Sequence, residues 1–511
     1  MDISRRSFLK ALGLGGAGAA GEKMSSHGTS PITQKFADTY HKVASPSPTP
    51  YRTVRRRKPP ESSKVYHVPA NAQESMGNSW AEKIKHAWKA AELDEIIDPG
   101  DNVAIKLHMG ERNRDAYIRP NQVRAVANLI KEAGGYPFVA DTLTAYFWKI
   151  ATRSSIKNYK ATAKTNGFTK ETVGCPVIPY CDGAGDSQLE VDIDGNQLET
   201  AYVARLLGEA DAYINLAHCK GHTLGMYGGA IKNAGIGGAS KQGKCIDHEN
   251  YVGPWETPRE TEVTGECPGK DECPAYGTPV VGNCEDWCPH GAFEVTSAGL
   301  EFDESVCQEE CKSTLASGCA ALANYGCKAK FTNVTEPAPS FRETAANTQI
   351  RFADTATALE NCFDGKAGYI GIMKDVAPEC DCLNYDSRPL VPNQGVVASK
   401  DMAALDTAVL DMYKAAPYLP GSLAEQKGLK AGDEKFEPIN GQSPYFQVNA
   451  VENLGYGTTN YELVEVEDSP WEYPWFLAPL YEWDYRESYE TLDYPEDKDV
   501  NESGAWYYTE E

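Results

Sequence analysis

The chain has 511 residues, of which 41% are hydrophobic and 15 are cysteines, and its formal net charge is −24. This globular composition and length allow a large buried core and two or three domains. The negative charge disfavours nucleic acid and anionic membranes as partners, because phosphates would be repelled, and it suits a cationic redox partner protein or a well-solvated surface.

The N-terminus matches a twin-arginine export signal. The motif "SRRSFLK" (4–10) precedes the weakly apolar run "ALGLGGAGAA" (11–20), and Ala17-Gly18-Ala19 offers a small-residue cleavage site. We therefore expect residues 1–19 to direct export to the periplasm or another extracytoplasmic space. Because this route carries folded proteins, a cofactor can be inserted before export. No run of 18 apolar residues follows, so we expect no membrane span.

Residues 20–60 are rich in proline and basic residues and are predicted to be a linker. Helix and strand patterns then alternate, which predicts an α/β domain with a mixed or parallel sheet. In its first part, 61–264, we expect strands at 102–109, 136–142 and 211–218 and helices at 120–135 and 201–210. In its second part, 331–425, we expect a helix at 341–360, strands at 367–373 and 395–399, and a helix at 403–415. Residues 426–511 are predicted to be a C-terminal extension, acidic and aromatic from about 467, either an arm over the core or a docking tail for a partner.

Residues 265–330 interrupt this pattern with two groups of four cysteines around an alternating, hairpin-like stretch. The arrangement, with the first group ending in Cys-Pro, resembles the two-cluster bacterial ferredoxins, although its loops are longer. The resemblance implies an inserted ferredoxin-like domain with one or two 4Fe-4S clusters. One cluster would be held by Cys267, Cys273, Cys284 and Cys327, and the other by Cys307, Cys311, Cys319 and Cys288. Four thiolates also suit structural zinc, and disulfides remain an alternative in an exported chain.

The segment "INLAHCKGHTLGMYGGAIKNAGIGGASKQGKCIDH" (214–248) predicts a buried strand that leads into a glycine-rich ligand site. Glycines let the backbone approach a ligand, and the carboxyl end of a strand is where α/β proteins bind ligands. We expect a small anionic or carbonyl substrate there, with His222 supplying a proton and Lys232 stabilising charge. His248 completes the catalytic set, and the cofactor-binding positions are expected at Gly228, Gly229 and Asn233. A tight crossover with surface lysines and histidines is the structural alternative.

Together with "CDCLNYDSRPLVPNQGVVASKDMAALDTAVLDM" (380–412), this segment resembles the domain of unknown function 362 family of iron–sulfur centre proteins. The resemblance covers most of 100–415, and many members of that family carry a ferredoxin-like insertion. A fainter likeness connects His222, Lys232 and His248 with the nickel-pincer lactate racemases. That likeness implies a proton-transferring histidine, a cofactor-bearing lysine and a nickel-binding histidine, in this order.

Seven further cysteines lie outside the insertion, and five of them need an interpretation: Cys219, Cys245, Cys362, Cys380 and Cys382. Cys219 and Cys245 are either small buried hydrophobic residues or part of a second metal site with Cys380, Cys382 and His248. Three functions follow from the sequence. The first is an exported iron–sulfur oxidoreductase, the second is an electron-transfer subunit without its own substrate, and the third is a nickel-dependent isomerase.

Overall fold

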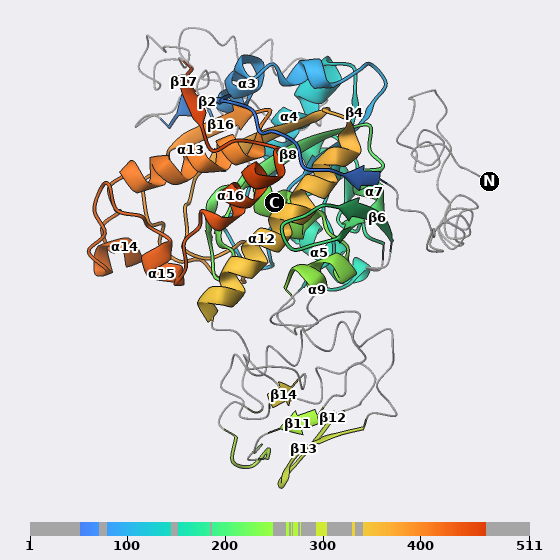
Figure 1. The fold of residues 1–511 in the computed structure, drawn as a ribbon, viewed down its shortest axis with the longest axis vertical. Coiled ribbons are helices and arrows are strands. Elements are labelled where there is room, and N and C mark those ends of the chain that lie inside the picture. Colours follow the sequence, from blue (N-terminus) through green and yellow to red (C-terminus); the bar gives the residue numbers. More distant parts are fainter. Residues whose placement is uncertain are drawn as a thin grey trace, which may run out of the picture.

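The computed structural model describes residues 52–70, 79–144, 152–183, 187–248 and 341–466, and short stretches between 262 and 332. Its centre is an eight-stranded mixed sheet (Figure 1). From one edge to the other the strands are β17 (Tyr461–Glu465), β2 (Ser63–Pro69), β16 (Gly395–Ser399), β15 (Ala367–Met373), β8 (Ala212–His218), β3 (Asn102–Lys106), β4 (Tyr136–Ala140) and β5 (Val177–Ile178).

The five strands from β15 to β5 run parallel, whereas β16 is antiparallel to both β15 and β2. The chain builds β3, β4 and β5 outward in one direction and then returns to place β8 and β15 on the other side of β3. The strand order therefore reverses between β3 and β8. In open α/β sheets, ligands bind beyond the carboxyl ends of the strands at such a reversal.

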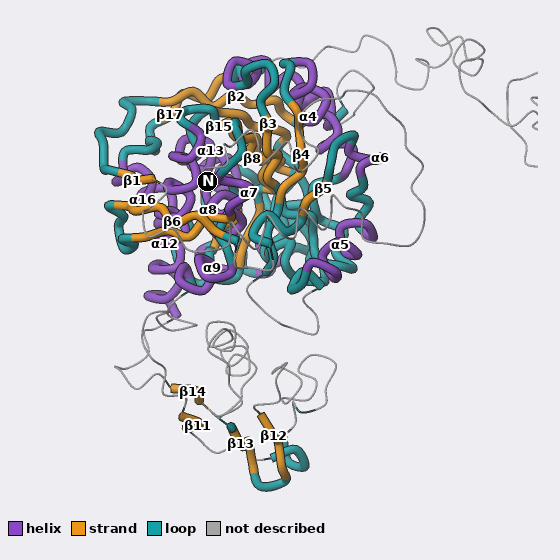
Figure 2. Tube along the Cα trace, turned by 90° about the vertical axis from the view of Figure 1, so that its right-hand side faces the viewer, coloured by secondary structure: helices purple, strands orange, loops and turns teal. Residues whose placement is uncertain are grey.

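Helices cover both faces of this sheet, because the side chains of its inner strands alternate between two apolar cores. In β3, Val103 and Ile105 face one core and Ala104 faces the other. The first core is covered by α3 (Trp80–Ala90) and α4 (Pro120–Glu132). The second is covered by α8 (Ala230–Gly238), α12 (Phe341–Glu360), α13 (Met402–Ala415) and α16 (Phe446–Leu454), as Figures 1 and 2 show.

The remaining elements are short. Strands β1 (Arg52–Val54), β6 (Gln188–Ile193) and β7 (Thr200–Ala204) form a second sheet, and β9 (Lys220–His222) pairs with β10 (Met226–Gly228). The short helices are η2 (Leu93–Ile96), α5 (Ile156–Thr165), α6 (Lys170–Val173), α7 (Arg205–Gly208), α9 (Lys241–Asp247), η5 (Asn361–Phe363), α14 (Leu423–Gln426) and α15 (Glu437–Asn440). Among the described helices, none combines the length and the apolar character that crossing a bilayer requires.

The predicted α/β class with a mixed sheet is confirmed, and one predicted element is wrong. Residues 201–210 were expected to form a helix, but β7 occupies Thr200–Ala204 and only α7 is helical. The reason is tertiary pairing, since the alternating side chains of β7 lie in register with those of β6, from Gln188 opposite Ala204 to Asp192 opposite Thr200.

The packed fold also extends beyond the predicted domain boundaries at both ends. Residues 52–54, expected in the linker, form β1, whose Val54 is buried in the core. Residues 446–465, expected in the C-terminal extension, form α16 and the edge strand β17. Both segments are too short to show a clear periodic pattern of apolar residues. Their place in the fold is determined by strands and helices that lie far away in the sequence.

Within 265–330 the structure describes a hairpin of β12 (Phe293–Thr296) and β13 (Gly299–Phe302), as the alternating pattern predicted. Nearby, β11 (Glu262–Thr264) pairs with β14 (Lys330–Thr332). The ferredoxin-like arrangement of the insertion stays a prediction, as do the signal peptide and the extracytoplasmic location, because residues 1–51 lie outside the described part of the chain.

Candidate functional site

The glycine-rich segment lies at the carboxyl end of β8, beside the reversal of strand order. β8 ends at His218, and the chain turns directly into the β9–β10 hairpin, whose six residues are all buried. Helix α8 then carries Lys232 back along the sheet, and α9 ends at His248. The segment that follows β15 brings Cys380 and Cys382 to the same place. Residues 220–228 therefore form a short, buried hairpin.

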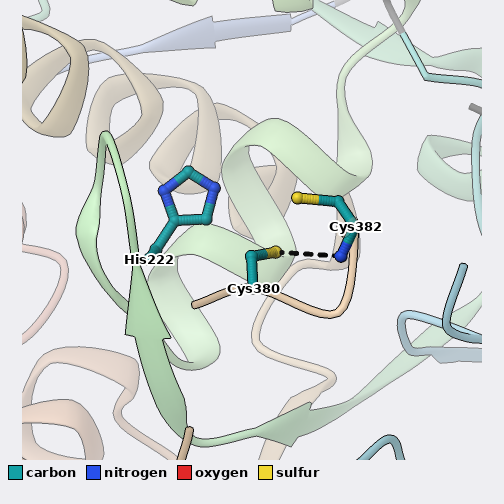
Figure 3. Close-up of side chains that lie close together, drawn as sticks. All are labelled: His222, Cys380 and Cys382. Carbon is teal, nitrogen blue, oxygen red and sulfur yellow. Dashed lines mark hydrogen bonds between the residues drawn. The ribbon is translucent and has the colours of Figure 1, made fainter. Parts of the chain in front are cut away.

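The centre of the site is a convergence of His222, Cys380 and Cys382 (Figure 3). One ring nitrogen of His222 and the two Sγ atoms all lie within 4.8 Å of one another. His222 and Cys380 are buried, and Cys382 is half-buried. One nitrogen and two sulfurs at this separation form a donor set that suits a thiophilic metal ion.

Cys380 carries the reactive thiolate of this group. Its Sγ accepts hydrogen bonds from Lys232 Nζ and from the backbone N–H of Cys382, both at 3.4 Å. Burial opposes ionisation, but the side-chain hydrogen bond from Cys382 and the positive charge of Lys232 outweigh it, and the pKa of Cys380 lies well below its usual value. The hydrogen bond to Cys380 together with burial raises the pKa of Cys382. The pair therefore consists of one thiolate and one thiol.

The orientation of the His222 ring is fixed by its own turn. Its Nδ1 accepts the backbone N–H groups of Gly225 at 2.7 Å and Leu224 at 3.1 Å, so Nε2 is the nitrogen left for the thiols. Burial and the charge of Lys232 lower the pKa of His222, which makes its ring neutral near pH 7. In this tautomer Nε2 carries the proton and donates it toward Cys380.

Lys232 is 9% exposed, and among the described residues no carboxylate pairs with it, so the Cys380 thiolate is its counter-charge. Lys220, 4% exposed, lies nearby but is paired with Asp381 at 3.4 Å. A lysine in a buried site without a carboxylate partner is suited to bind an anionic group of a ligand.

His248 caps the C-terminus of α9 and is buried. Its Nδ1 donates to the carbonyl of Lys244 at 2.6 Å, which leaves Nε2 as the acceptor nitrogen. Burial is the main cause that lowers the pKa of His248 to about 4, and the nearby His222 and Lys232 contribute. His222, Lys232 and His248 are thus close enough to influence one another, as the sequence suggested. His248 does not, however, join the two thiols as a donor; His222 does.

The glycines mostly serve close packing. Helix α8 starts at Gly229, where a side chain would collide with Asp406 and Tyr227, and the Asp406 carboxylate accepts the N–H groups of Ala230 and Ile231 at 2.8 Å. These helix-start amides are therefore satisfied within the protein and do not bind a ligand. Gly235 allows α8 to lie against the backbone of Phe352 on α12.

Two other expected cofactor positions differ from each other. A Cβ on Gly228 would lie 3.3 Å from Lys220 Nζ and 3.4 Å from Lys232 Cδ, so this glycine leaves space where the two lysines meet. The amide of Asn233 instead donates to Lys106 O at 3.0 Å and Asn215 Oδ1 at 2.7 Å and accepts from Lys106 Nζ at 2.9 Å. Asn233 thus joins α8 to β3 and β8.

Among the cysteines whose side chains the structure describes, Cys219 and Cys362 are not part of this site. Cys219 is fully buried, where burial raises its pKa to about 12, and Cys362 is buried and donates to Ala358 O at 3.5 Å. Both behave as small apolar residues. Of the eight expected cluster ligands the structure describes Cys267 and Cys273, which are free thiols and half-buried. The other six, and the side chain of Cys245, lie outside the described residues.

Sequence reasoning missed three buried groups that complete the site. Asp381, between the two cysteines, binds His218, Lys220 and Arg114. His108 follows β3, and its Nδ1 accepts the N–H of Gly110 at 3.0 Å while its Nε2 is buried without a partner among the described residues. The run "KLHMGERNR" (106–114) contains His108 and Arg114, but the sequence does not show that the ends of β3 and β8 lie side by side, so it did not assign them to the site.

The sequence from Val103 to Asp411, more than half of the chain, matches the family described as "domain of unknown function (DUF362)". The chain belongs to the DUF362 family. This DUF362 protein is also 26% identical over 135 residues to the thylakoid-associated protein sll1697 of Synechocystis sp.. The match takes in 25% of this chain and 37% of that protein, so it spans little more than a third of the relative.

Among solved structures, this DUF362 protein is similar to the lactate racemase apoprotein from Thermoanaerobacterium thermosaccharolyticum. The identity is 10% and the TM-score is 0.29, and the alignment covers 81% of this chain and 88% of that one.

The donor set fits a bound metal in kind and number. Three protein donors leave a position open for a substrate, which is typical of catalytic rather than structural sites. Cys380, Cys382 and Nε2 of His222 would hold the metal, and Nε2 would have to give up its proton, because Nδ1 accepts the N–H groups of Leu224 and Gly225.

Proposed function

We propose that this protein is a metal-dependent oxidoreductase that acts on a small anionic or carbonyl substrate. The α/β domain would bind the metal and the substrate, and 4Fe-4S clusters in residues 265–330 would exchange electrons with a partner protein. The observation that carries the proposal is the convergence of His222, Cys380 and Cys382 beside Lys232, at the carboxyl end of β8.

The roles of the residues follow from their contacts. A thiophilic metal held by Cys380, Cys382 and His222 supplies Lewis acidity toward an oxygen of the substrate. Once the Cys380 charge is shared with the metal, the ammonium of Lys232 is left to pair with an anionic group of the substrate. His248 is neutral at pH 7 and presents an acceptor nitrogen, so its role is to receive a proton.

The test is a comparison of metal and acid-labile sulfide in anaerobically purified wild type, Cys382→Ala and Cys175→Ala. Cys175 is a buried thiol beside β5, outside the site, and serves as the matched control. We expect one metal ion to be lost in Cys382→Ala alone, while about eight iron and eight sulfide, the content of two 4Fe-4S clusters, stay constant in all three. Equal metal content in the three proteins would overturn the metal site.

The redox part is tested separately. Reduction of a dye by the wild type with a panel of small hydroxy-acids, and oxidation of a reduced dye with the matching oxo-acids, should be lost in Lys232→Met while the cluster signals stay unchanged. Clusters that accept electrons without any substrate-dependent turnover would instead favour an electron-transfer subunit.

The second candidate is a nickel-dependent isomerase, and the proximity of His222, Lys232 and His248 favours it. Nickel in stoichiometric amount, together with a reaction that reduces no dye, would select this function over the first.

A further inference from the structure

Asp381, the residue between the two cysteines, makes several contacts with side chains from other parts of the fold. Asp381 is fully buried, and its carboxylate is surrounded by three basic side chains. Nδ1 of His218 lies 3.0 Å from both carboxylate oxygens, Nε of Arg114 lies 3.2 Å from Oδ1, and Nζ of Lys220 lies 3.4 Å from Oδ2.

The backbone of the same segment is held as well. The carbonyl of Asp381 accepts the N–H of Glu111 at 2.8 Å, and Glu379 accepts the N–H of Ser387 at 2.8 Å and pairs with Arg114 at 3.3 Å. Glu379 and Asp381, which flank Cys380, therefore each have a partner outside the segment. This leaves the two thiols little freedom to change their separation.

The partners of Asp381 connect the two halves of the donor set. His218 ends β8, and Lys220 begins β9, the strand that ends with His222. One carboxylate thus ties the strand that carries the nitrogen donor to the segment that carries both sulfur donors. The pairing of β15 with β8 brings these elements to the same end of the sheet, and the Asp381 carboxylate adds a side-chain link between the three donors, which lie within 4.8 Å of one another.

We propose that Asp381 is the positioning residue of the site, which holds Cys380 and Cys382 at the separation needed to bind one metal ion together with His222. The proposal rests on the metal site proposed above. Asp381 touches no ligand in this role and acts only through the residues that flank it and through β9. Outer partners of this kind typically account for 10- to 100-fold of metal affinity.

The experiment is titration of the full-length, chelator-treated protein with Co²⁺, whose thiolate charge-transfer absorption reports how many sulfurs bind. The absorption that belongs to this site is the difference between the spectrum of the wild type and the spectrum of Cys382→Ala. In Asp381→Asn we expect the affinity to fall at least 10-fold and the charge-transfer intensity per cobalt to decrease. The matched control is Asp386→Asn, since Asp386 faces the same Arg114 at 3.5 Å but is not adjacent to either cysteine. We expect the cobalt affinity of the control to stay within about twofold of that of the wild type, because position 386 has no contact with the sulfurs.

A second variant keeps the test decisive if Asp381→Asn does not fold. His218→Gln removes one partner and leaves Lys220 and Arg114 in place, and it should give an intermediate loss of affinity with the same spectral change. Wild-type affinity and spectrum in a folded Asp381→Asn or His218→Gln would overturn the positioning role. Equal cobalt spectra in wild type and Cys382→Ala would instead overturn the metal site itself, so the two failures are distinguishable.

Discussion

Lys232 Nζ on α8 lies 3.4 Å from the Sγ of Cys380, which follows 148 positions later in the chain. This contact joins the glycine-rich segment to the cysteine pair and makes a single site of two motifs that look unrelated in the sequence. It also places a positive charge beside the thiol that must ionise before it can bind a metal.

Lys232→Met should therefore raise the pKa of Cys380 in the metal-free protein. Removal of a charge at hydrogen-bonding distance shifts a thiol by about 1–2 pKa units. The measurement is thiolate absorbance against pH, taken as the difference between each protein and its Cys380→Ala derivative. Lys241→Met on α9, whose Nζ donates to Ser154 O, is the control and should titrate as the wild type does. An unchanged difference curve for Lys232→Met would contradict the assignment.

Two neighbouring glycines should respond differently to alanine. In Gly229→Ala the new Cβ collides with the Asp406 carboxylate and the Tyr227 hydroxyl, which are packed and bonded to each other, so we expect a loss of about 1–3 kcal/mol in the free energy of unfolding. In Gly228→Ala the contacts are the flexible ends of Lys220 and Lys232, so stability should change by less than about 1 kcal/mol. Urea unfolding measures this difference in the free energy of unfolding between the two variants. Gly228→Ala should stay folded and yet bind the metal more weakly than the wild type.

Asp406 is expected to stabilise the start of α8. Asp406→Ala leaves the N–H groups of Ala230 and Ile231 and the hydroxyl of Tyr227 without their buried acceptor, which should cost about 2–4 kcal/mol. Asp406→Asn keeps one acceptor oxygen and should lose less. Chemical denaturation of the two variants checks the order, and equal losses would mean that the carboxylate charge, rather than the hydrogen bonds, is responsible.

Asp247 should make stability depend on pH. Its Oδ1 accepts the Thr355 hydroxyl at 2.8 Å, its Oδ2 has no partner among the described residues, and burial raises its pKa to about 7. A folded-state pKa above the unfolded value means that this contribution to stability is complete below about pH 4 and is lost as the pH rises through 7.

Asp247→Asn removes this titration. The variant should gain about 1–3 kcal/mol over the wild type at pH 8, and the gain should vanish near pH 4. Thermal or urea unfolding at several pH values measures it, with Asp94→Asn at an exposed position as the control. A gain that is the same at pH 4 and pH 8 would show that Asp247 does not titrate in this range.

Much of the α/β core could be predicted from the sequence, because its strands are buried on both faces and therefore appear as continuous apolar runs. The runs at 367–373 and 395–399 correspond residue for residue to β15 and β16, and the helix expected at 341–360 is α12. The sequence also predicted a candidate site in the glycine-rich segment, since His222 and Lys232 follow a buried strand and are surrounded by glycines.

The composition of the site was decided by tertiary structure. Cys380 and Cys382 have no pattern that assigns them to His222 rather than to His248, and only the parallel pairing of β15 with β8 brings the segment after β15 to the end of β8. The roles of the glycines were decided in the same way. Whether Gly229 faces a ligand or the Asp406 carboxylate depends on α13, a helix far away in the sequence. Residue types and spacing determine local structure, whereas the atoms that meet at a site are determined by the order of the strands.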